Sequence, residues 1–374
     1  MTLSYDEYRG VKYFTALDGV RAIAVLMVVT WHVPGRQFLG LQGYRGVTTF
    51  FVLSGFLITT LGLREESKTG RLRVSGFFVR RVFRILPLYY LVLLVNVLVV
   101  YGVDDSQRAH HAFSRSLPYY LTFMQEYPGA ARFVGAPFAI SWSLGIEEKF
   151  YLVWPVVGFL LLRGQRNGRV AVVGATTIAI VLLGYLRPDA ITTRLVLPYV
   201  FVLLGCLLAV LLHEPRIYER FRALGRPSVA LAIASVTGLV WILGSRSNTV
   251  SYVFGVLVAL TIAGLVIGRT LVSRALSVRA VVWVGTISYP LYLVHVLGLS
   301  FANKVFGVPG GPDALGRDAV VLLVGLVLAV VASAVLHRVV ELPMIGVGRR
   351  LSARLAARTQ PTSDGGVAVP DPAE

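Results

Sequence analysis

Three ionisable residues stand in the apolar stretch LDGVRAIAVLMVVTWH (residues 17–32), which otherwise has the composition of a membrane span. Asp18 and Arg21 lie near its start, and His32 ends it. A charged group inside a bilayer is costly and usually faces a polar interior, so each of the three is a candidate functional residue. His32 follows Arg21 by 11 positions, about 20° past three full helical turns. We therefore expect Arg21 and His32 to share one helix face, about 16 Å apart along its axis.

Three arginines in FFVRRVFRILPLYY, namely Arg80, Arg81 and Arg84, lie at the expected start of another span. Arg81 and Arg84 are three positions apart, and Arg80 and Arg84 four, so each pair can share a helix face. Membrane topology alone accounts for a basic cluster at this place. Guanidinium groups also bind phosphate through two parallel hydrogen bonds, so the cluster is equally a candidate phosphate clamp.

Two adjacent carboxylates occur in SWSLGIEEKFYLVWP, residues 141–155, where a further span begins. Glu147 and Glu148 point about 100° apart on a helix, so they cannot face one site equally. Glu147 shares a face with Tyr151 and Trp154. A partly buried carboxylate can act as a base or orient a histidine, and the alternative is an acidic cap at a helix start. The sequence leaves open which glutamate is the working one.

Tyr289, Tyr292 and His295 follow one another at three-residue intervals in ISYPLYLVH. Polar groups inside an apolar span often only bridge neighbouring helices, and the spacing favours that role. Tyr289 and His295 remain candidates for substrate binding.

Residues 104–141 form the longest expected loop. Its start holds Asp104, Asp105, His110 and His111, a set that suggests a metal site by residue type alone. The spacing fits no usual metal-binding pattern, so we expect a solvated loop and predict no metal site. Loops of this length are often functional.

The composition places these candidates in a membrane protein. Of the 374 residues only 15% are charged and 56% are hydrophobic, whereas soluble proteins carry about 25% charge. The mean hydropathy is +0.71, and apolar stretches of about 20 residues recur throughout. We therefore expect an all-α polytopic membrane protein with about ten transmembrane helices. The expected spans are residues 14–33, 46–63, 83–103, 146–163, 169–187, 194–212, 228–244, 250–267, 281–302 and 319–340.

The basic residues predict the orientation. The net charge is +17, which in a soluble protein would suggest nucleic acid. With the N-terminus inside, about 24 Lys and Arg fall in inner segments and about 10 in outer ones, as the positive-inside rule requires. The sequence thus favours a lipid bilayer over nucleic acid as partner, and both termini are expected to be cytoplasmic. Residues 1–13 form a cytoplasmic segment, 14–350 the transmembrane domain, and 351–374 a cytoplasmic tail of disordered composition.

Six motifs occur in an order and spacing that resemble the acyltransferase-3 family of membrane O-acyltransferases, over residues 14–350: LDGVRAIAVLMVVTWH, FFVLSGFLIT, RRVFRILPLYY, SWSLGIEEKFYLVWP, SYPLYLVH and ELP. The family's motifs fall on Arg21 and His32 (arginine, ten residues, histidine), on Arg81 and Arg84 (arginine-x-x-arginine), and on Trp142, Ser143, Leu144 and Glu147 (tryptophan-serine-leucine-x-x-glutamate).

The resemblance implies an enzyme of the bacterial cytoplasmic membrane with no tightly bound cofactor. Such proteins take an acyl group, most often acetyl, from cytoplasmic acyl-CoA and deliver it to a hydroxyl of a carbohydrate, glycolipid, envelope polymer or sugar-bearing natural product. Many members carry an esterase-like soluble domain after the membrane part. We recognise none after residue 350, which favours a stand-alone enzyme with direct transfer, or transfer to a separate partner.

Each candidate residue receives a role on this basis. The expected roles are catalysis for His32 and Glu147, binding of acyl-CoA for Arg21, Arg80, Arg81 and Arg84, and substrate binding for Asp18, Trp142, Ser143, Tyr151, Tyr289 and His295. Glu147 is the candidate to orient His32.

Two other classes of protein fit part of the pattern. A secondary transporter or flippase would also need buried charges, but we find no paired interrupted segments in corresponding halves. A structural or sensory membrane protein would leave Arg21, His32 and Glu147 without a purpose.

Overall fold

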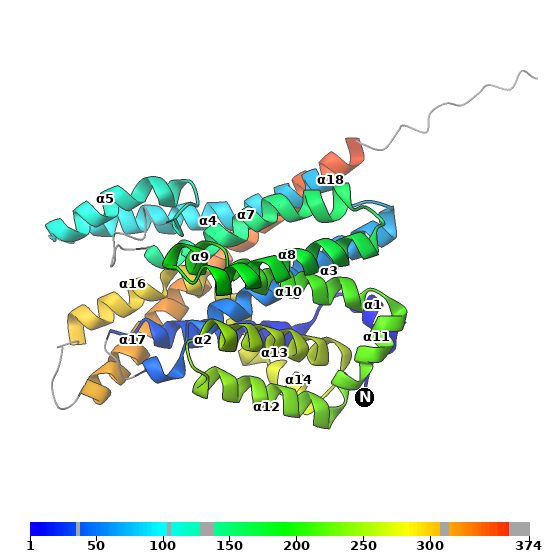
Figure 1. Ribbon diagram of the computed structural model, residues 1–374. Helices are drawn as coiled ribbons and strands as arrows, with labels where there is room; N and C mark the ends of the chain where they lie inside the picture. The colour runs from blue at the N-terminus through cyan, green and yellow to red at the C-terminus, as the bar shows by residue number, and fades with distance from the viewer. Residues whose placement is uncertain (35–37, 103–105, 128–137, 307–313, 359–374) are drawn as a thin grey trace, which may run out of the picture.

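The computed structural model describes residues 1–34, 38–102, 106–127, 138–306 and 314–358, and the elements in these ranges are helices. Figure 1 shows the longer helices running side by side. The α-helices are α1 (Tyr5–Gly10), α2 (Thr15–Trp31), α3 (Arg45–Thr69), α4 (Val74–Gly102), α5 (Gln107–Leu121), α7 (Trp142–Pro155), α8 (Arg166–Leu186), α9 (Ala190–Leu195), α10 (Pro198–Leu212), α11 (Pro215–Phe221), α12 (Pro227–Leu243), α13 (Asn248–Ile267), α14 (Leu271–Leu276), α15 (Arg279–Thr286), α16 (Ser288–Phe306), α17 (Ala314–Leu336) and α18 (Leu342–Arg358). Short turns of 3₁₀-helix are η1 (Leu39–Leu41), η2 (Ala139–Ser141) and η4 (Arg222–Gly225), and π-helix forms η3 (Val156–Leu161) and η5 (His337–Glu341).

Six helices of the described residues are long and apolar enough to cross a membrane, or up to eight if each of two bent pairs is one span. The bent pairs are Pro215–Gly225 with Pro227–Leu243 (78°) and Arg279–Thr286 with Ser288–Phe306 (75°). The all-helical membrane architecture predicted from the sequence is thus confirmed, whereas the count of ten spans and the cytoplasmic termini stay predictions. Two expected spans fall outside this set because α2 has 17 residues and α7 has 14 before it continues as π-helix.

Glycine lets α3 and α10 pack with their backbones in contact. A Cβ added at Gly55 of α3 would lie 2.0 Å from the carbonyl oxygen of Val202, and one at Gly205 of α10 would lie 2.1 Å from that of Val52. Any larger residue would force the two helices apart, which is the close approach that small residues permit in membrane bundles.

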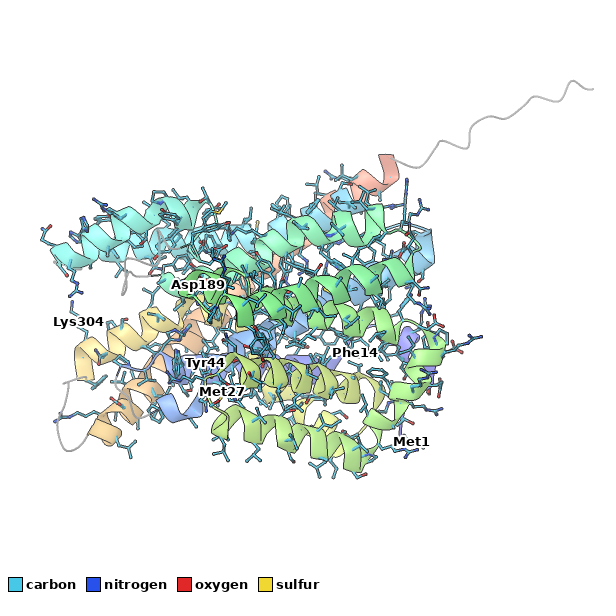
Figure 2. All side chains as sticks on the ribbon, viewed as in Figure 1. Met1, Phe14, Met27, Tyr44, Asp189 and Lys304 are labelled. Carbon is cyan, nitrogen blue, oxygen red and sulfur yellow. The ribbon has the colours of Figure 1, made fainter. Side chains whose placement is uncertain are left out.

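The first long helix, α2, lies among α3, α15 and α16. The contact with α15 is equally close, since a Cβ at Gly285 would meet the carbonyl oxygen of Asp18 at 2.0 Å. Figure 2 shows Met1 and Phe14 toward one end of the bundle and Lys304 at the other. The helix that carries Asp18, Arg21 and His32 therefore runs from the N-terminal end of the bundle toward the opposite end.

The last helices form one long, continuous rod. Helix α17 passes through the π-helical turn η5 into α18, which packs along α4. The end of α18 and the N-terminus lie at the same end of the bundle (Figure 1). The expectation of a disordered tail from residue 351 is wrong for residues 351–358, which are the last turns of α18. Residues 359–374 lie outside the described ranges.

The segment expected as a long loop also differs from its prediction. Residues 107–121 form α5, whose Ser106 caps the helix through a hydrogen bond from the backbone N–H of Ala109. His110 and His111 lie on this helix, whereas Asp104 and Asp105 lie outside the described residues. The turn chemistry of Ser106 was the local signal for the helix start.

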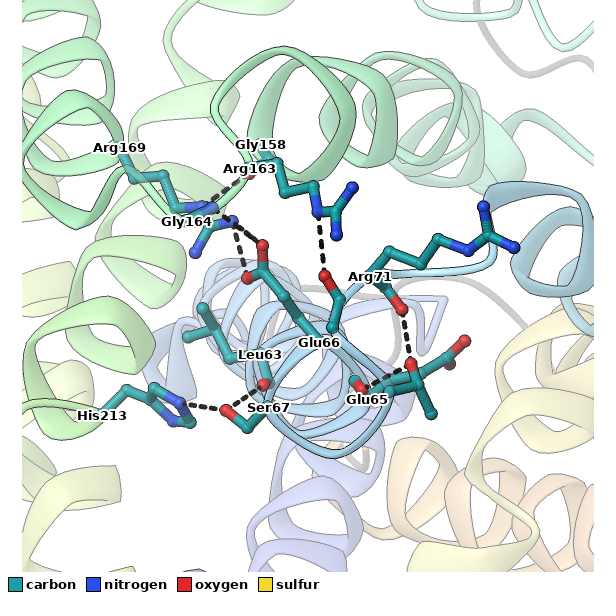
Figure 3. A network of polar contacts seen from close by, with 12 residues as sticks. Leu63, Glu65, Glu66, Ser67, Arg71, Gly158, Arg163, Gly164, Arg169 and His213 are labelled. Atoms are coloured by element: carbon teal, nitrogen blue, oxygen red, sulfur yellow. Dashed lines mark hydrogen bonds and ion pairs between the residues drawn. The ribbon is translucent and has the colours of Figure 1, made fainter.

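A buried ion pair between Arg169 and Glu66 joins α8 to α3 (Figure 3). Nη2 of Arg169 donates to both carboxylate oxygens of Glu66, at 2.8 and 2.7 Å, and its Nε donates to the carbonyl oxygen of Gly158 at 2.6 Å. The backbone N–H of Gly164 donates to the same carboxylate at 2.9 Å. This network fixes the end of α3. The same helix supplies several side chains to the candidate site.

Candidate active site

A cavity of about 390 Å³ lies where α2, α3, α4, α7, α16 and the turn η5 meet. Five lysine and arginine side chains line it, against three carboxylates. These are Lys12, Arg21, Arg64, Arg81 and Arg84, and Asp18, Glu147 and Glu341. The cavity is therefore suited to a ligand that carries negative charge.

The start of α2 supplies a fixed ion pair to this cavity. Nη1 of Arg21 lies 2.8 Å from Oδ1 of Asp18, whose side chain is 3% exposed. The hydroxyl of Tyr13 donates to the other oxygen of the same carboxylate. Burial, followed by this hydrogen bond, raises the pKa of Tyr13 to about 12, so the phenol remains a donor. Asp18 thus holds Arg21 and Tyr13 in place at the cavity wall.

The three arginines of α4 do not share one place. Arg81 and Arg84 line the cavity, with the guanidinium of Arg81 5.3 Å from the centre of the Tyr151 ring. The side chain of Arg84 is exposed, and the cavity is the space that it faces. Arg80 instead pairs with Glu65 at 3.0 Å and donates to Ser352 at 2.9 Å, in a neighbouring cleft. Helix rotation turns Arg80 away from the cavity, so the cluster expected as one clamp is divided.

Glu147 is the carboxylate of α7 that faces the cavity. Its Oε2 accepts a hydrogen bond from the hydroxyl of Tyr151 at 2.6 Å and lies 3.5 Å from Oγ of Ser54, which is also hydrogen-bonded to Tyr151. Glu148 points elsewhere, and within the described part of the chain its buried Oε1 has no hydrogen-bond partner. The geometry thus places Glu147, and not Glu148, at the cavity.

The inner end of the cavity is closed by hydroxyl groups. The hydroxyl of Tyr292 lies 2.8 Å from Oγ of Ser143 and donates to the carbonyl oxygen of Ile140 at 2.7 Å. Tyr289, also in the lining, donates to the carbonyl oxygen of Ile85 at 2.8 Å. Trp142 packs edge-on against Phe51 at 6.2 Å between ring centres and is not among the described lining residues.

His32 lies just beyond this inner end, and it too is not one of the described residues that line the cavity. Its Nδ1 lies 2.8 Å from the carbonyl oxygen of Val28 and 3.2 Å from Nε2 of His295. The ring of His295 in turn lies 5.9 Å from that of Tyr292. The expectation that Glu147 orients His32 is therefore wrong in geometry, because His295 occupies the position beside His32 and Glu147 bonds to Tyr151.

Several residues that line the cavity were not recognised from the sequence. The lining also holds Lys12, Arg64 and Ser54, which were not among the candidate residues. Glu341 lines the cavity as well, and its carboxylate lies 2.6 Å from Nδ1 of His337, four positions earlier. The i, i+4 spacing of His337 and Glu341 was the signal for this pair.

Together, the helical membrane fold and the cationic cavity describe a polytopic membrane protein with an internal site for an anionic ligand. Comparison with known families names the class more closely: the family model of the acyltransferase domain, acyltransferase 3, matches residues 14–338. The chain therefore belongs to the acyltransferase-3 family.

The relatives that this chain resembles are bacterial. It is 28% identical over 336 residues to a provisionally named O-acetyltransferase of Staphylococcus aureus strain COL, covering 82% of this chain and 54% of the relative. It is 28% identical over 324 residues to the peptidoglycan O-acetyltransferase OatA of Listeria monocytogenes (79% and 51% covered), and 26% identical over 364 residues to the O-acetyltransferase OatA of S. aureus strain NCTC 8325 (89% and 57%). The chain thus spans about half the length of these relatives. No solved structure matches it significantly.

Proposed function

We propose that this protein is a membrane O-acetyltransferase that moves an acetyl group from acetyl-CoA to a hydroxyl of a carbohydrate, glycolipid, envelope polymer or sugar-bearing natural product. The cationic cavity in a member of an acyltransferase family carries the proposal. CoA bears a diphosphate and a further phosphate, for which arginine is the preferred partner. A transporter or flippase is disfavoured, because neither transfers an acyl group.

The donor occupies the cavity with its phosphates toward the N-terminal end of the bundle. Lys12 is exposed there, and Arg64 lies across the same cavity. Arg21, Arg81 and Arg84 line the way inward, and the pantetheine arm extends past them toward Tyr292. The volume of about 390 Å³ is within the usual range for small-molecule sites, about 300–1,000 Å³.

The chemistry requires a base and donors for a developing oxyanion. His32 accepts the proton of the acceptor hydroxyl while the hydroxyl oxygen attacks the carbonyl carbon of the thioester. The tetrahedral intermediate then expels CoA thiolate, which takes up a proton, and an ester remains on the acceptor. Tyr292, which lines the cavity and whose ring contacts His295, supplies the donor for the oxyanion once its O–H turns away from the Ile140 carbonyl.

The acceptor approaches from the opposite side of the membrane. The Listeria relative is named a peptidoglycan O-acetyltransferase, which supports a cell-envelope saccharide as the acceptor class. Ser143, Tyr289 and Tyr292 present hydroxyl groups at the cavity wall for its hydroxyls. This proposal includes a bacterial cytoplasmic membrane, about ten spans and cytoplasmic termini, in agreement with the distribution of basic residues.

Acetyl transfer by purified protein in lipid nanodiscs tests the proposal directly. Acetyl-CoA labelled in its acetyl group is mixed with cell-envelope saccharides, and both free thiol release and label in the saccharide are measured. We expect His32→Gln to lower transfer about 1,000-fold, as for the loss of a general base. His213→Gln is the matched control, because His213 hydrogen-bonds Ser67 at the N-terminal end, away from the two histidines.

Three results would contradict the proposal in different ways. Equal transfer by wild type and His32→Gln would remove His32 as the base. Label held on the protein in place of the saccharide would replace direct transfer by a covalent route. Absence of thiol release with every acyl-CoA, acceptor and preparation would remove acyl-CoA as the donor.

A further inference from the structure

Two histidines from helices far apart in the sequence form a contact next to the cavity. Nε2 of His295 on α16 lies 3.2 Å from Nδ1 of His32, at the end of α2, and the rings meet edge-on at 4.9 Å between centres. His295 is fully buried, at 0% exposure, and His32 is half-buried. Each ring therefore has one nitrogen in a defined, water-poor contact.

Carbonyl groups decide where the proton of His295 lies. Its Nδ1 is 2.8 Å from the carbonyl oxygen of Tyr292 and 3.2 Å from that of Leu291. A carbonyl oxygen only accepts hydrogen bonds, so Nδ1 of His295 carries the proton. A neutral imidazole holds one N–H, so its Nε2 is unprotonated and presents a lone pair to His32.

The same argument fixes His32. Its Nδ1 is 2.8 Å from the carbonyl oxygen of Val28, which also only accepts. Two acceptors, the Val28 oxygen and Nε2 of His295, thus surround one ring nitrogen, and both are satisfied only if that nitrogen carries the proton. Nε2 of His32 is then the unprotonated atom, with its lone pair free to accept a proton.

We propose that His295 is a positioning residue that, together with the Val28 carbonyl, holds His32 in the tautomer with the proton on Nδ1 and leaves Nε2 as the base. This inference rests on the proposed function for its catalytic meaning. A group behind a catalytic histidine commonly fixes the tautomer and ring orientation in this way. Here the group is a neutral imidazole, so no buried carboxylate is needed behind the base.

The contact with His295 affects both the charge and the orientation of His32. When His32 takes a proton on Nε2, its Nδ1–H becomes a stronger donor, and the lone pair of His295 stabilises the resulting cation without a full countercharge. Because two carbonyls anchor the ring of His295, the ring of His32 has its orientation set before the acceptor arrives. The effect of His295 on turnover is therefore through His32.

Nitrogen-15 NMR of histidine-labelled protein in proteoliposomes reads the tautomer independently of activity. The signals of His32 are identified by their loss in His32→Gln. At neutral pH we expect a protonated Nδ1 and an unprotonated Nε2 for His32 in the wild type. In His295→Leu the His32 ring loses its second acceptor and can turn away from the Val28 carbonyl, so its signals should divide between both tautomers. His295→Gln, whose amide oxygen can still accept from Nδ1, should keep the wild-type pattern.

Turnover of the same variants separates a positioning role from a merely structural one. We expect His295→Leu to lower kcat about 100-fold through misplacement of the base, with KM for acetyl-CoA unchanged. His295→Gln should recover at least about tenfold of that loss. Monodisperse elution of each variant confirms that it is folded.

Each contrary outcome has one meaning. An unprotonated Nδ1 on His32 in the wild type overturns the inference, as does equal kcat for His295→Leu and His295→Gln. If wild type shows the expected tautomer but transfers no acetyl group, the proposed function fails and the tautomer assignment stands. If it transfers acetyl with the proton on Nε2, the function stands and the inference fails.

Discussion

Glu147 and Glu148 are neighbours on α7 with different surroundings. Glu147 contacts Tyr151 and Ser54 at the cavity, whereas Glu148 is not among the described lining residues. We expect Glu147→Gln to lower kcat for acetyl transfer about 100-fold, because the charged carboxylate that holds the Tyr151 hydroxyl in place at the cavity wall is lost and the reacting groups are misplaced. Glu148→Gln is isosteric and should change kcat less than about threefold. A larger effect of Glu148→Gln would reverse the assignment.

The arginines of α4 give a second matched pair. Arg84 lies open to the cavity, while Arg80 is engaged by Glu65 and Ser352. We expect Arg84→Gln to raise KM for acetyl-CoA about tenfold or more, since a charge-assisted hydrogen bond to phosphate contributes about 1.5–3 kcal/mol. Steady-state kinetics with Arg80→Gln should show KM within about twofold of wild type. Equal rises in both variants would mean that the donor also uses the neighbouring cleft.

Between elements, the contact of α3 with α10 depends on two glycines. Gly205→Ala places a methyl group against the carbonyl oxygen of Val52, and the helices must separate to admit it. We expect a loss of about 1–3 kcal/mol in stability, the usual cost of overpacking. The control is Gly174→Ala on α8, where a Cβ meets nothing within 4 Å. The measurement is the temperature at which each variant loses monodisperse elution in detergent, and equal temperatures would show that α3 and α10 can move apart freely.

The ion pair between α3 and α8 makes a stability prediction of another kind. Glu66→Gln leaves Arg169, whose side chain is 4% exposed, without its charge partner. Removing one partner of a buried pair costs about 3–5 kcal/mol, so the melting temperature should fall markedly. Glu214→Gln breaks the ion pair between Glu214, whose side chain is 26% exposed, and Arg166, whose side chain is 44% exposed. This substitution should lower the stability by less than about 1 kcal/mol. Similar losses for the two variants would contradict the burial argument.

The orientation of the entire bundle can be tested with introduced cysteines. The native Cys206 is fully buried, so it gives little background labelling. Lys68 at the end of α3 and Ser245 after α12 are exposed and belong to segments expected on opposite sides. In right-side-out membrane vesicles, an impermeant maleimide should label Ser245→Cys at once and Lys68→Cys only after permeabilisation. The reverse order would place the termini outside.

The sequence by itself determined the class of protein and most of the candidate residues. Long apolar stretches can only be buried as helices in a bilayer, because the backbone must satisfy its own hydrogen bonds there. The cost of an intramembrane charge marked Arg21, His32 and Glu147. These are local properties of composition and spacing, so no contact between distant segments was needed to recognise them.

Only the tertiary structure decided which of these residues meet. The rotation of α4 and α7 about their axes turned Arg84 and Glu147 toward the cavity and Arg80 and Glu148 away from it. The packing of α16 beside α2 brought His295 to His32 across 263 positions of sequence. Helical spacing predicts which residues share a face, but the neighbour that covers that face is set by packing between helices, and so is the chemistry of the group beside the base.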